Sequence, residues 1–152
     1  MSKPSRSLPK SLPQIGWREW VSLPEFGNAR VKAKIDTGAK TSAIHAHNIR
    51  EDVEGDQLFV TFDLHPKQRA MTPRIPCRAK VIDRRSIRNS GGQQETRYVI
   101  LTPAAIGLYE ISIELTLTRR DAMGFRMLLG RDAVKKRFLV NPGRSFLHGN
   151  DR

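Results

Sequence analysis

The segment at residues 35–39 (Ile-Asp-Thr-Gly-Ala) carries the strongest chemical signal in the sequence. It places the carboxylate of Asp36 at the end of an alternating stretch, with a hydroxyl and a glycine after it. Glycine lets the backbone turn tightly so that a carboxylate can project into a cleft, and the Thr37 hydroxyl can hydrogen-bond to that turn. An aspartic peptidase needs this arrangement, with Asp36 as the catalytic carboxylate and Thr37 and Gly38 holding its loop. The tripeptide alone is a weak signal, because Asp and Gly mark turns in many proteins.

Two further segments strengthen the interpretation of residues 35–39 as the loop of an aspartic peptidase. Residues 127–132 (Met-Leu-Leu-Gly-Arg-Asp) form an apolar block that ends in glycine and arginine and leads into a short helix expected over residues 132–138. Residues 89–93 (Asn-Ser-Gly-Gly-Gln) lie between two expected strands and predict a hairpin tip, because glycine accepts positive φ.

These three segments, in this order, resemble the retropepsin-like aspartic peptidases. In that family the strand with the catalytic Asp-Thr-Gly-Ala lies beside the apolar-Gly-Arg block, and the hairpin closes over the substrate as a flap. The blocks at residues 16–24, 33–46, 114–120 and 127–133 narrow the resemblance to one bacterial group. It is the RimB-like group, long labelled an ATP-dependent zinc protease, which includes the partner of the glutamate ligase RimK. The resemblance extends from Ile15 to Leu147.

The resemblance implies an endopeptidase that cuts acidic peptides, in particular α-linked poly-glutamate tails that the ligase adds to a ribosomal protein. It also implies roles for further residues. The expected support of the catalytic loop comes from Leu129, Gly130 and Arg131. The expected substrate contacts near the loop and at the flap tip are Ala39, Ser90, Gly91 and Gly92.

The mechanism of an aspartic peptidase sets a stoichiometry. Two carboxylates share one proton, so that one activates water while the other polarises the scissile carbonyl. The chain has one Asp-Thr-Gly; Asp83 precedes two arginines and Asp132 follows the Gly-Arg pair, so neither has the same setting. We therefore expect a homodimer in which Asp36 of each chain meets its mate across a two-fold axis.

The charge of the chain fits an acidic partner. Lys and Arg number 27 against 15 Asp and Glu, a formal charge of +12, which concentrates polyanions near the surface.

Lys40 stands where viral retropepsins carry an acid, and this substitution removes the acidic partner of Arg131. Arginine grips carboxylates bidentately. Strand alternation puts Arg84 and Arg88 on one face and Arg85 on the other. The expected substrate contacts are Lys40, Arg84, Arg88 and Arg97.

Two other functions compete with this one. The charge alone is compatible with a basic RNA- or ribosome-binding β-barrel module without catalysis. Against it, aromatic residues make up only 7% and are not interleaved with basic residues as stacking platforms would require. The other is a dimeric scaffold with a degenerate site, against which the intact Asp-Thr-Gly-Ala argues.

A metal site is not expected. The pair His45 and His47 has the only spacing that could support one, with His65, Cys77 and His148 as remote candidates. The sequence lacks a His-Glu-x-x-His pattern and paired cysteines, and it has no glycine-rich nucleotide loop, so we expect neither metal nor cofactor. Cys77 is most simply a buried small apolar residue.

The length of the chain predicts one domain, and its pattern of short alternating segments predicts an all-β fold. With 152 residues, 38% of them apolar, a single cysteine, no long apolar run and no secretory pattern, the chain is expected to be cytoplasmic. We expect a flexible basic tail at 1–13 and one retropepsin-like domain at 14–152. The domain is predicted to be a closed barrel with one short C-terminal helix and a glycine-tipped flap hairpin. A loop is expected at 66–76, and strands at 17–23, 31–35, 42–46, 57–64, 78–87, 96–102, 111–118 and 125–129.

Overall fold

The alternation of apolar and basic side chains before Asp36 makes that segment a half-buried strand. The computed structural model describes residues 12–67, 70–88, 91–119 and 124–149, and the segment is β3, whose residues alternate between buried and partly exposed. The described elements are β1 (Gln14–Gly16), β2 (Arg18–Leu23), β3 (Ala29–Asp36), β4 (Ser42–His45), β5 (His47–Glu54), β6 (Gln57–Leu64), β7 (Ile75–Lys80), β8 (Asp83–Arg88), β9 (Gln94–Ile106), β10 (Tyr109–Thr118), β11 (Met127–Gly130), α1 (Arg131–Val134) and β12 (Leu139–Asn141). The expected all-β fold with one short helix is confirmed.

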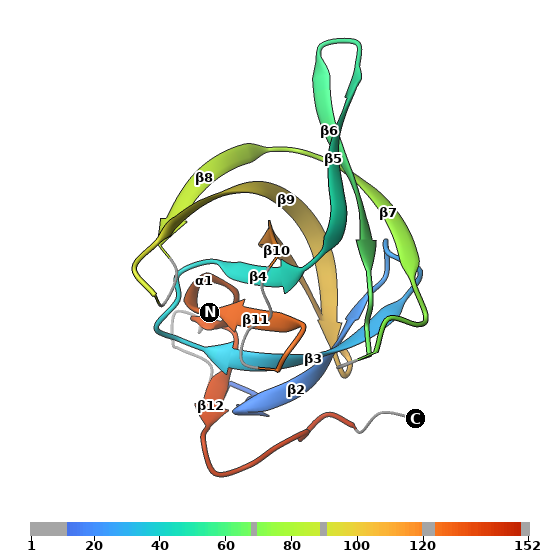
Figure 1. Cartoon of the computed structure of the whole chain (residues 1–152). Coiled ribbons are helices and arrows are strands. Elements are labelled where there is room, and N and C mark those ends of the chain that lie inside the picture. The colour runs from blue at the N-terminus through green and yellow to red at the C-terminus, as the bar shows by residue number, and fades with distance from the viewer. Residues whose placement is uncertain (1–11, 68–69, 89–90, 120–123, 150–152) are drawn as a thin grey trace, which may run out of the picture.

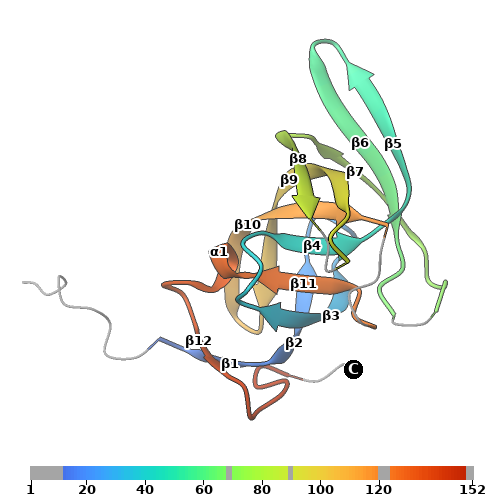
Figure 2. The ribbon, with the colours of Figure 1, turned by 60° about the vertical axis from the view of Figure 1, so that its left-hand side comes forward.

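The main sheet returns on itself. Its strand order is β10-β4-β11-β3-β2-β9-β8, and β9 also pairs with β10, so the pairing from β10 through β9 forms a ring to which β8 is added (Figure 1). In Figure 2 the strands β10, β4, β11 and β3 lie in that order across the ring. A parallel pair, β11 with β3, lies inside this mostly antiparallel sheet and carries Asp36 at the end of β3. A small parallel sheet of β1 with β12 lies below it (Figure 2).

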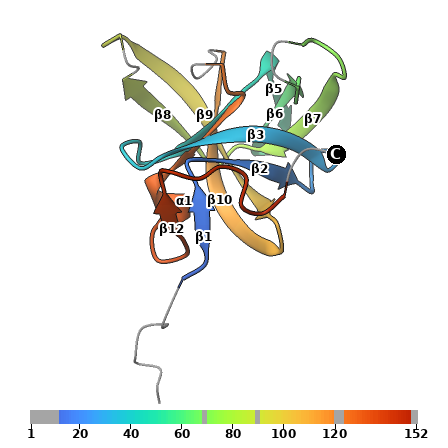
Figure 3. The same ribbon diagram turned by 90° about the horizontal axis from the view of Figure 1, so that it is seen from below.

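A second, three-stranded sheet has the order β5-β6-β7. Its β5–β6 hairpin extends well beyond the rest of the ribbon in both Figure 1 and Figure 2. Seen from below, the three-stranded sheet and the β8–β9 hairpin rise on opposite sides of the molecule (Figure 3).

The core lies inside the ring of strands. Its largest fully buried apolar side chains come from strands of the ring, from β1 and from the three-stranded sheet: Ile15, Val21, Leu23, Ile44, Leu64, Ile100, Ile106, Leu115, Leu117, Met127 and Leu129. Burial of this apolar surface is the main favourable contribution to folding.

The prediction of a single strand over residues 78–87 is wrong, because two strands, β7 and β8, share this segment. The N–H of Val81 donates to the carbonyl of Leu58 (2.9 Å), whereas the N–H of Ile82 donates to the carbonyl of Val99 (2.9 Å). The backbone therefore changes partner between adjacent residues, and β7 and β8 belong to different sheets. As a result Arg78 lies on the three-stranded sheet, apart from the hairpin that carries Arg84.

Three other expectations need correction. No strand was expected at β5, because its exposed, polar residues show no apolar alternation. The loop expected at 66–76 ends earlier, since β7 begins at Ile75. The helix expected over 132–138 is α1, of four residues; Lys135 is extended (φ −61°, ψ 138°) and Lys136 has φ +66°, so the helix cannot continue.

Some expectations fall outside the described residues. Most of the tail expected at 1–13 is among them, and so is Ser90 of the expected flap tip. In the part of the chain that is described, no helix has the length and apolar character needed to cross a membrane.

Candidate active site

Asp36 ends β3 and opens the loop that the sequence singles out. Its side chain is partly exposed, and its Oδ1 accepts a hydrogen bond from the N–H of Gly38 (3.0 Å). The N–H of Ala39 donates to the main-chain carbonyl of Asp36 (3.2 Å), which closes the turn. A Cβ on Gly38 would lie 3.2 Å from Asp36 Oδ1, so glycine gives this backbone its close approach to the carboxylate. One carboxylate oxygen is thus fixed by the loop itself.

The block at residues 127–132 supports this loop from the neighbouring strand. In the parallel pairing of β11 with β3, Gly130 stands opposite Asp36, and Leu129 is fully buried opposite Ile35. The N–H of Arg131 donates to the carbonyl of Ala39 (2.7 Å). The N–H of Gly130 donates to the buried Oγ of Ser42 (3.0 Å). The expected proximity of the two segments is confirmed, and Ser42 is a contact that the sequence did not single out.

Two charged side chains beside the loop have defined partners. Arg131 Nη1 donates to the main-chain carbonyl of Thr37 (2.9 Å), so the arginine holds the loop through its backbone. Lys40 Nζ forms an ion pair with Asp132 (2.8 Å) at the start of α1. The hydrogen bond from Lys40 lowers the pKa of Asp132 below its ordinary value.

A pocket lies between the loop and the β8–β9 hairpin. The loop and the strands after it contribute one wall, and the hairpin contributes the other. Its lining residues are Ala39, Lys40, Thr41, Ala43, Leu128, Arg85, Ser86, Ile87 and Arg97. A second pocket shares Lys40, Thr41 and Arg85 with the first and reaches Glu114 and Asp132.

The structure brings some of the expected substrate contacts together and separates others. Lys40 and Arg97 line the first pocket with Ala39, and their contact with a substrate stays a prediction. Neither pocket is lined by Arg84 or Arg88. Arg84 is directed to the projecting β5–β6 hairpin, where its Nη2 donates to Glu51 (2.9 Å). Arg88 is exposed at the end of β8.

The strands on either side of the hairpin tip expected at residues 89–93 pair with each other, and Asn89 and Ser90 lie outside the described residues. β8 and β9 are antiparallel, with Arg88 opposite Gln94. Gly91 and Gly92 are exposed at the tip, and Gly92 has φ +84°, a conformation that favours glycine. Its closing over a substrate remains a prediction.

Arg85 lies beside the loop, although it was not among the substrate contacts expected from the sequence. It lines both pockets and is partly buried, and its guanidinium contacts Glu114 and Asp83, each at 2.8 Å. Strand alternation separated Arg85 from Arg84 correctly. Alternation alone does not say which face meets the loop; in the structure Arg85 and Ile87 are the less exposed residues of β8.

A histidine cluster lies away from this loop. The ring of His47 is 4.5 Å from that of His45 and 4.4 Å from that of His65, centroid to centroid, so the fold gathers candidates that are remote in sequence. His47 Nε2 and His65 Nδ1 are buried and have no hydrogen-bond partner among the described residues, and Arg126 Nη1 lies 2.8 Å from His45 Nδ1. Within the described ranges, no group of three or more His, Cys, Asp or Glu side chains has the arrangement to hold a metal ion.

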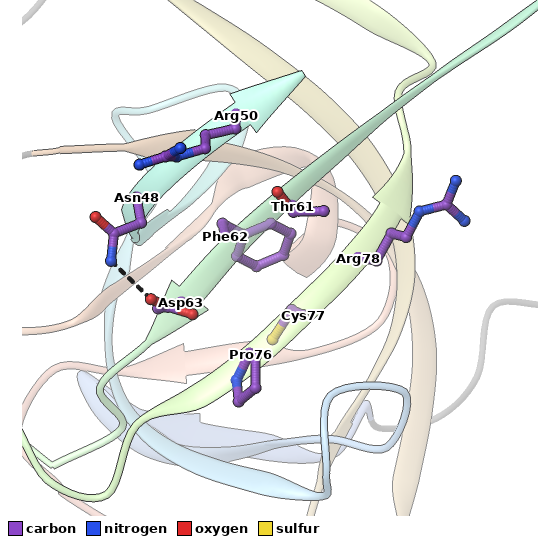
Figure 4. Close-up of a pocket in the computed structure, with 8 residues that line it drawn as sticks. All are labelled: Asn48, Arg50, Thr61, Phe62, Asp63, Pro76, Cys77 and Arg78. Carbon is purple, nitrogen blue, oxygen red and sulfur yellow. Dashed lines mark hydrogen bonds between the residues drawn. The ribbon is translucent and has the colours of Figure 1, made fainter. Parts of the chain in front are cut away.

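A further pocket lies on the three-stranded sheet. Figure 4 shows Asn48 donating to Asp63 (2.8 Å) beside Cys77 and Pro76, with Arg50 and Arg78 directed to opposite sides. The hydrogen bond from Asn48 lowers the pKa of Asp63. Burial raises the pKa of Cys77 to about 12, so its thiol is protonated and unreactive at neutral pH. Cys77 is half-buried and packs against the core, as a small apolar residue would.

The fold and the supported Asp-Thr-Gly loop define the class of retropepsin-like proteins. The family model of the retropepsin-like aspartic endopeptidase RimB matches residues 14–151. The chain therefore belongs to the RimB-like family of retropepsin-like aspartic endopeptidases. A crystal structure of a Legionella pneumophila protein of unknown function shares the fold, with a TM-score of 0.76 and 26% identity over 90% of this chain and 98% of that one.

Curated relatives carry a different name and are much longer. A Shewanella halifaxensis protein is 47% identical over 135 residues, 89% of this chain and 30% of that protein. A Desulfotalea psychrophila protein is 48% identical over 128 residues, 84% of this chain and 28% of that protein. Both are named "Probable alpha-L-glutamate ligase". This chain thus spans less than a third of the length of these relatives.

Proposed function

We propose that the protein is an aspartic endopeptidase, active as a homodimer, that hydrolyses acidic peptides and in particular α-linked poly-glutamate. The observation that carries the proposal is the Asp36 loop, with its carboxylate oxygen bound by Gly38 and its backbone held by Arg131, the residue directly after the parallel strand β11. A rigid support of this kind fixes the direction of a reacting carboxylate.

The chemistry assigns one role to each of two Asp36 residues. The ionised carboxylate takes a proton from water, and the resulting hydroxide adds to the scissile carbonyl carbon. The protonated carboxyl hydrogen-bonds to the carbonyl oxygen and stabilises its developing charge. The C–N bond then breaks, the amine leaves with a proton, and one carboxyl is left protonated for the next turnover.

The need for two carboxylates supports the homodimer. The chain has one Asp-Thr-Gly. Two carboxylates of the neighbouring pocket are engaged with cations, Asp132 with Lys40 and Glu114 with Arg85. A second copy related by a two-fold axis would supply the same Asp36 loop from the other side.

Charge and relatives support the acidic substrate. Lys40, Arg85 and Arg97 line the pocket beside the loop, where a chain of glutamates would find cations instead of repulsion. The relatives named as glutamate ligases match this chain over less than a third of their length. We infer that the two activities act on one polymer, which the ligase forms and the peptidase shortens on a ribosomal protein.

Incubation with peptides of different charge tests the proposal. We expect the wild type to shorten α-linked oligo-glutamate and to leave neutral and basic peptides of equal length intact, with no effect of a chelator. Asp36→Asn should remain dimeric by light scattering and should be inactive. If neither protein cut any peptide while both bound RNA with a steep salt dependence, the basic RNA-binding module would replace the peptidase.

A further inference from the structure

Two arginines stand directly opposite each other on the hairpin beside the candidate active site. In the antiparallel pairing of β8 with β9, Arg85 is the partner of Arg97. Directly opposed residues share a face of the sheet, and like charges in such a pair are destabilising. The pairing of β8 with β9 alone therefore gives no reason for an arginine at both positions.

The pair is held by carboxylates of the chain itself. Arg85 Nη1 lies 2.8 Å from Glu114 on β10, and Arg97 Nε lies 3.0 Å from Glu95. The side chain of Arg97 is 11% exposed and that of Arg85 is 32% exposed. Reduced contact with water strengthens the attraction of these guanidinium groups for a carboxylate. Glu114 is itself 44% exposed, so a competing carboxylate from solution can reach this position.

The remaining walls of the pocket fit a glutamate side chain. Lys40 adds a third cation, and Ala43, Ile87 and Leu128 supply apolar surface. A glutamate has two methylene groups, which pack against such surface, and a terminal carboxylate, which a guanidinium holds bidentately. The pocket adjoins Ala39, directly after the Asp36 loop, so a peptide cut at that loop would pass it.

We propose that Arg85 and Arg97 form a carboxylate clamp for one glutamate side chain of the substrate. In the free protein Glu114 and Asp83 pair with Arg85, and Glu95 pairs with Arg97. The substrate carboxylate displaces Glu114 from Arg85. The proposal rests on the proposed function, and it makes Arg85 and Arg97, rather than Arg84 and Arg88, the residues that select an acidic substrate. Arg84 lies on the opposite face, with Tyr98 as its cross-strand partner and Glu51 as its ion-pair partner.

Binding measured without cleavage separates the clamp from the catalysis. All variants are made in the Asp36→Asn protein, and fluorescence anisotropy follows a labelled α-linked hexaglutamate at fixed ionic strength. We expect Arg85→Gln and Arg97→Gln each to weaken binding about tenfold or more, as loss of a hydrogen bond to a charged group does. Arg78→Gln removes the same charge from the distant three-stranded sheet and should change binding less than about twofold.

Glu114→Gln is a second variant, and we expect it to change the affinity for hexaglutamate in the opposite direction. Loss of the competing carboxylate should tighten binding of hexaglutamate severalfold, whereas a residue that only supports the fold would weaken binding or leave it unchanged. Thermal denaturation of each variant checks that it is folded.

The clamp is overturned if Arg84→Gln weakens binding as much as Arg85→Gln does, if Glu114→Gln fails to tighten it, or if hexaglutamate does not bind at all. Failure of the peptidase proposal is a separate result: the wild type would bind hexaglutamate through the clamp without cutting it.

Discussion

Gly130 stands opposite Asp36 in the parallel pairing of β11 with β3, and no other residue fits there without a shift of the backbone. A Cβ at Gly130 would lie 2.7 Å from the carbonyl carbon of Thr41 and 3.0 Å from the carbonyl oxygen of Ala39. Both atoms belong to the segment that continues the Asp36 loop. The glycine therefore sets the distance between the supporting strand and the candidate catalytic loop.

Gly130→Ala should reduce peptidase activity strongly, while the free energy of unfolding decreases only modestly. The added methyl group pushes the main chain at Ala39 and Thr41, and a displacement of about 1 Å at a reacting group can cost about a hundredfold in rate. Cleavage of α-linked oligo-glutamate and urea denaturation measure the two effects. Gly143→Ala is the matched control, since its Cβ would meet only Asn141 Oδ1 at 3.5 Å. Equal activity of the two variants would mean that the close contact at Gly130 does not position the loop.

Glu19 should be the most important single carboxylate for stability among those with described contacts. Its side chain is fully buried and accepts hydrogen bonds from the N–H groups of Gly16 (2.6 Å) and Leu147 (3.0 Å), which join β2 to the C-terminal segment. Glu19→Ala leaves these buried donors without an acceptor and should lower the free energy of unfolding by about 2–4 kcal/mol. Chemical denaturation measures this, with exposed Glu25→Ala as the control. A loss no larger than that of Glu25→Ala would contradict the assignment.

The histidine cluster should make the protein less stable in mild acid. Burial lowers the pKa of His65 in the folded protein below its ordinary 6.5, and the charges of His47, Arg126 and Arg74 act in the same direction, against the smaller opposite effect of Asp63. The unfolded chain therefore takes up a proton more readily. The stabilisation is fully present above pH 6.5 and is lost as the pH falls below that value toward the lowered pKa.

Urea denaturation at a series of pH values from about 8 to about 5 tests this effect. As the pH is lowered, protonation of His65 should reduce the free energy of unfolding by at most about 1.4 kcal/mol per pH unit. The free energy of unfolding of His65→Gln should decrease less steeply over the same range. The difference between the variant and the wild type should be independent of pH in the upper part of the series. Parallel curves over the whole range would show that His65 does not cause the acid sensitivity.

The strand that bears Asp36 and its support were predictable because they rest on local patterns. Alternation marks β3, the turn chemistry of Thr37 and Gly38 marks the loop, and the apolar run before Gly130 marks β11. That the two segments lie side by side was expected from the resemblance to retropepsins; their parallel pairing, with Gly130 opposite Asp36, comes from the structure.

What was missed depends on pairings between distant segments. The change of partner between Val81 and Ile82 involves Leu58 and Val99, neither of which is near them in sequence. Likewise, which face of β8 lies toward the Asp36 loop depends on how the hairpin sits against that loop, so the position of Arg85 beside it could not be predicted from alternation. Most of β5 lacks apolar alternation because it forms an exposed hairpin, so periodicity could not reveal it.

Mixing active and inactive subunits tests the two-chain dyad most directly. Wild type and Asp36→Asn are unfolded together, refolded at a series of ratios with total protein held constant, and assayed on α-linked oligo-glutamate. If both carboxylates are needed, only dimers of two wild-type chains cut, so an equal mixture should retain about a quarter of the wild-type activity. Retention of about half, with activity linear in the wild-type fraction, would mean that one chain suffices and would contradict the two-chain dyad.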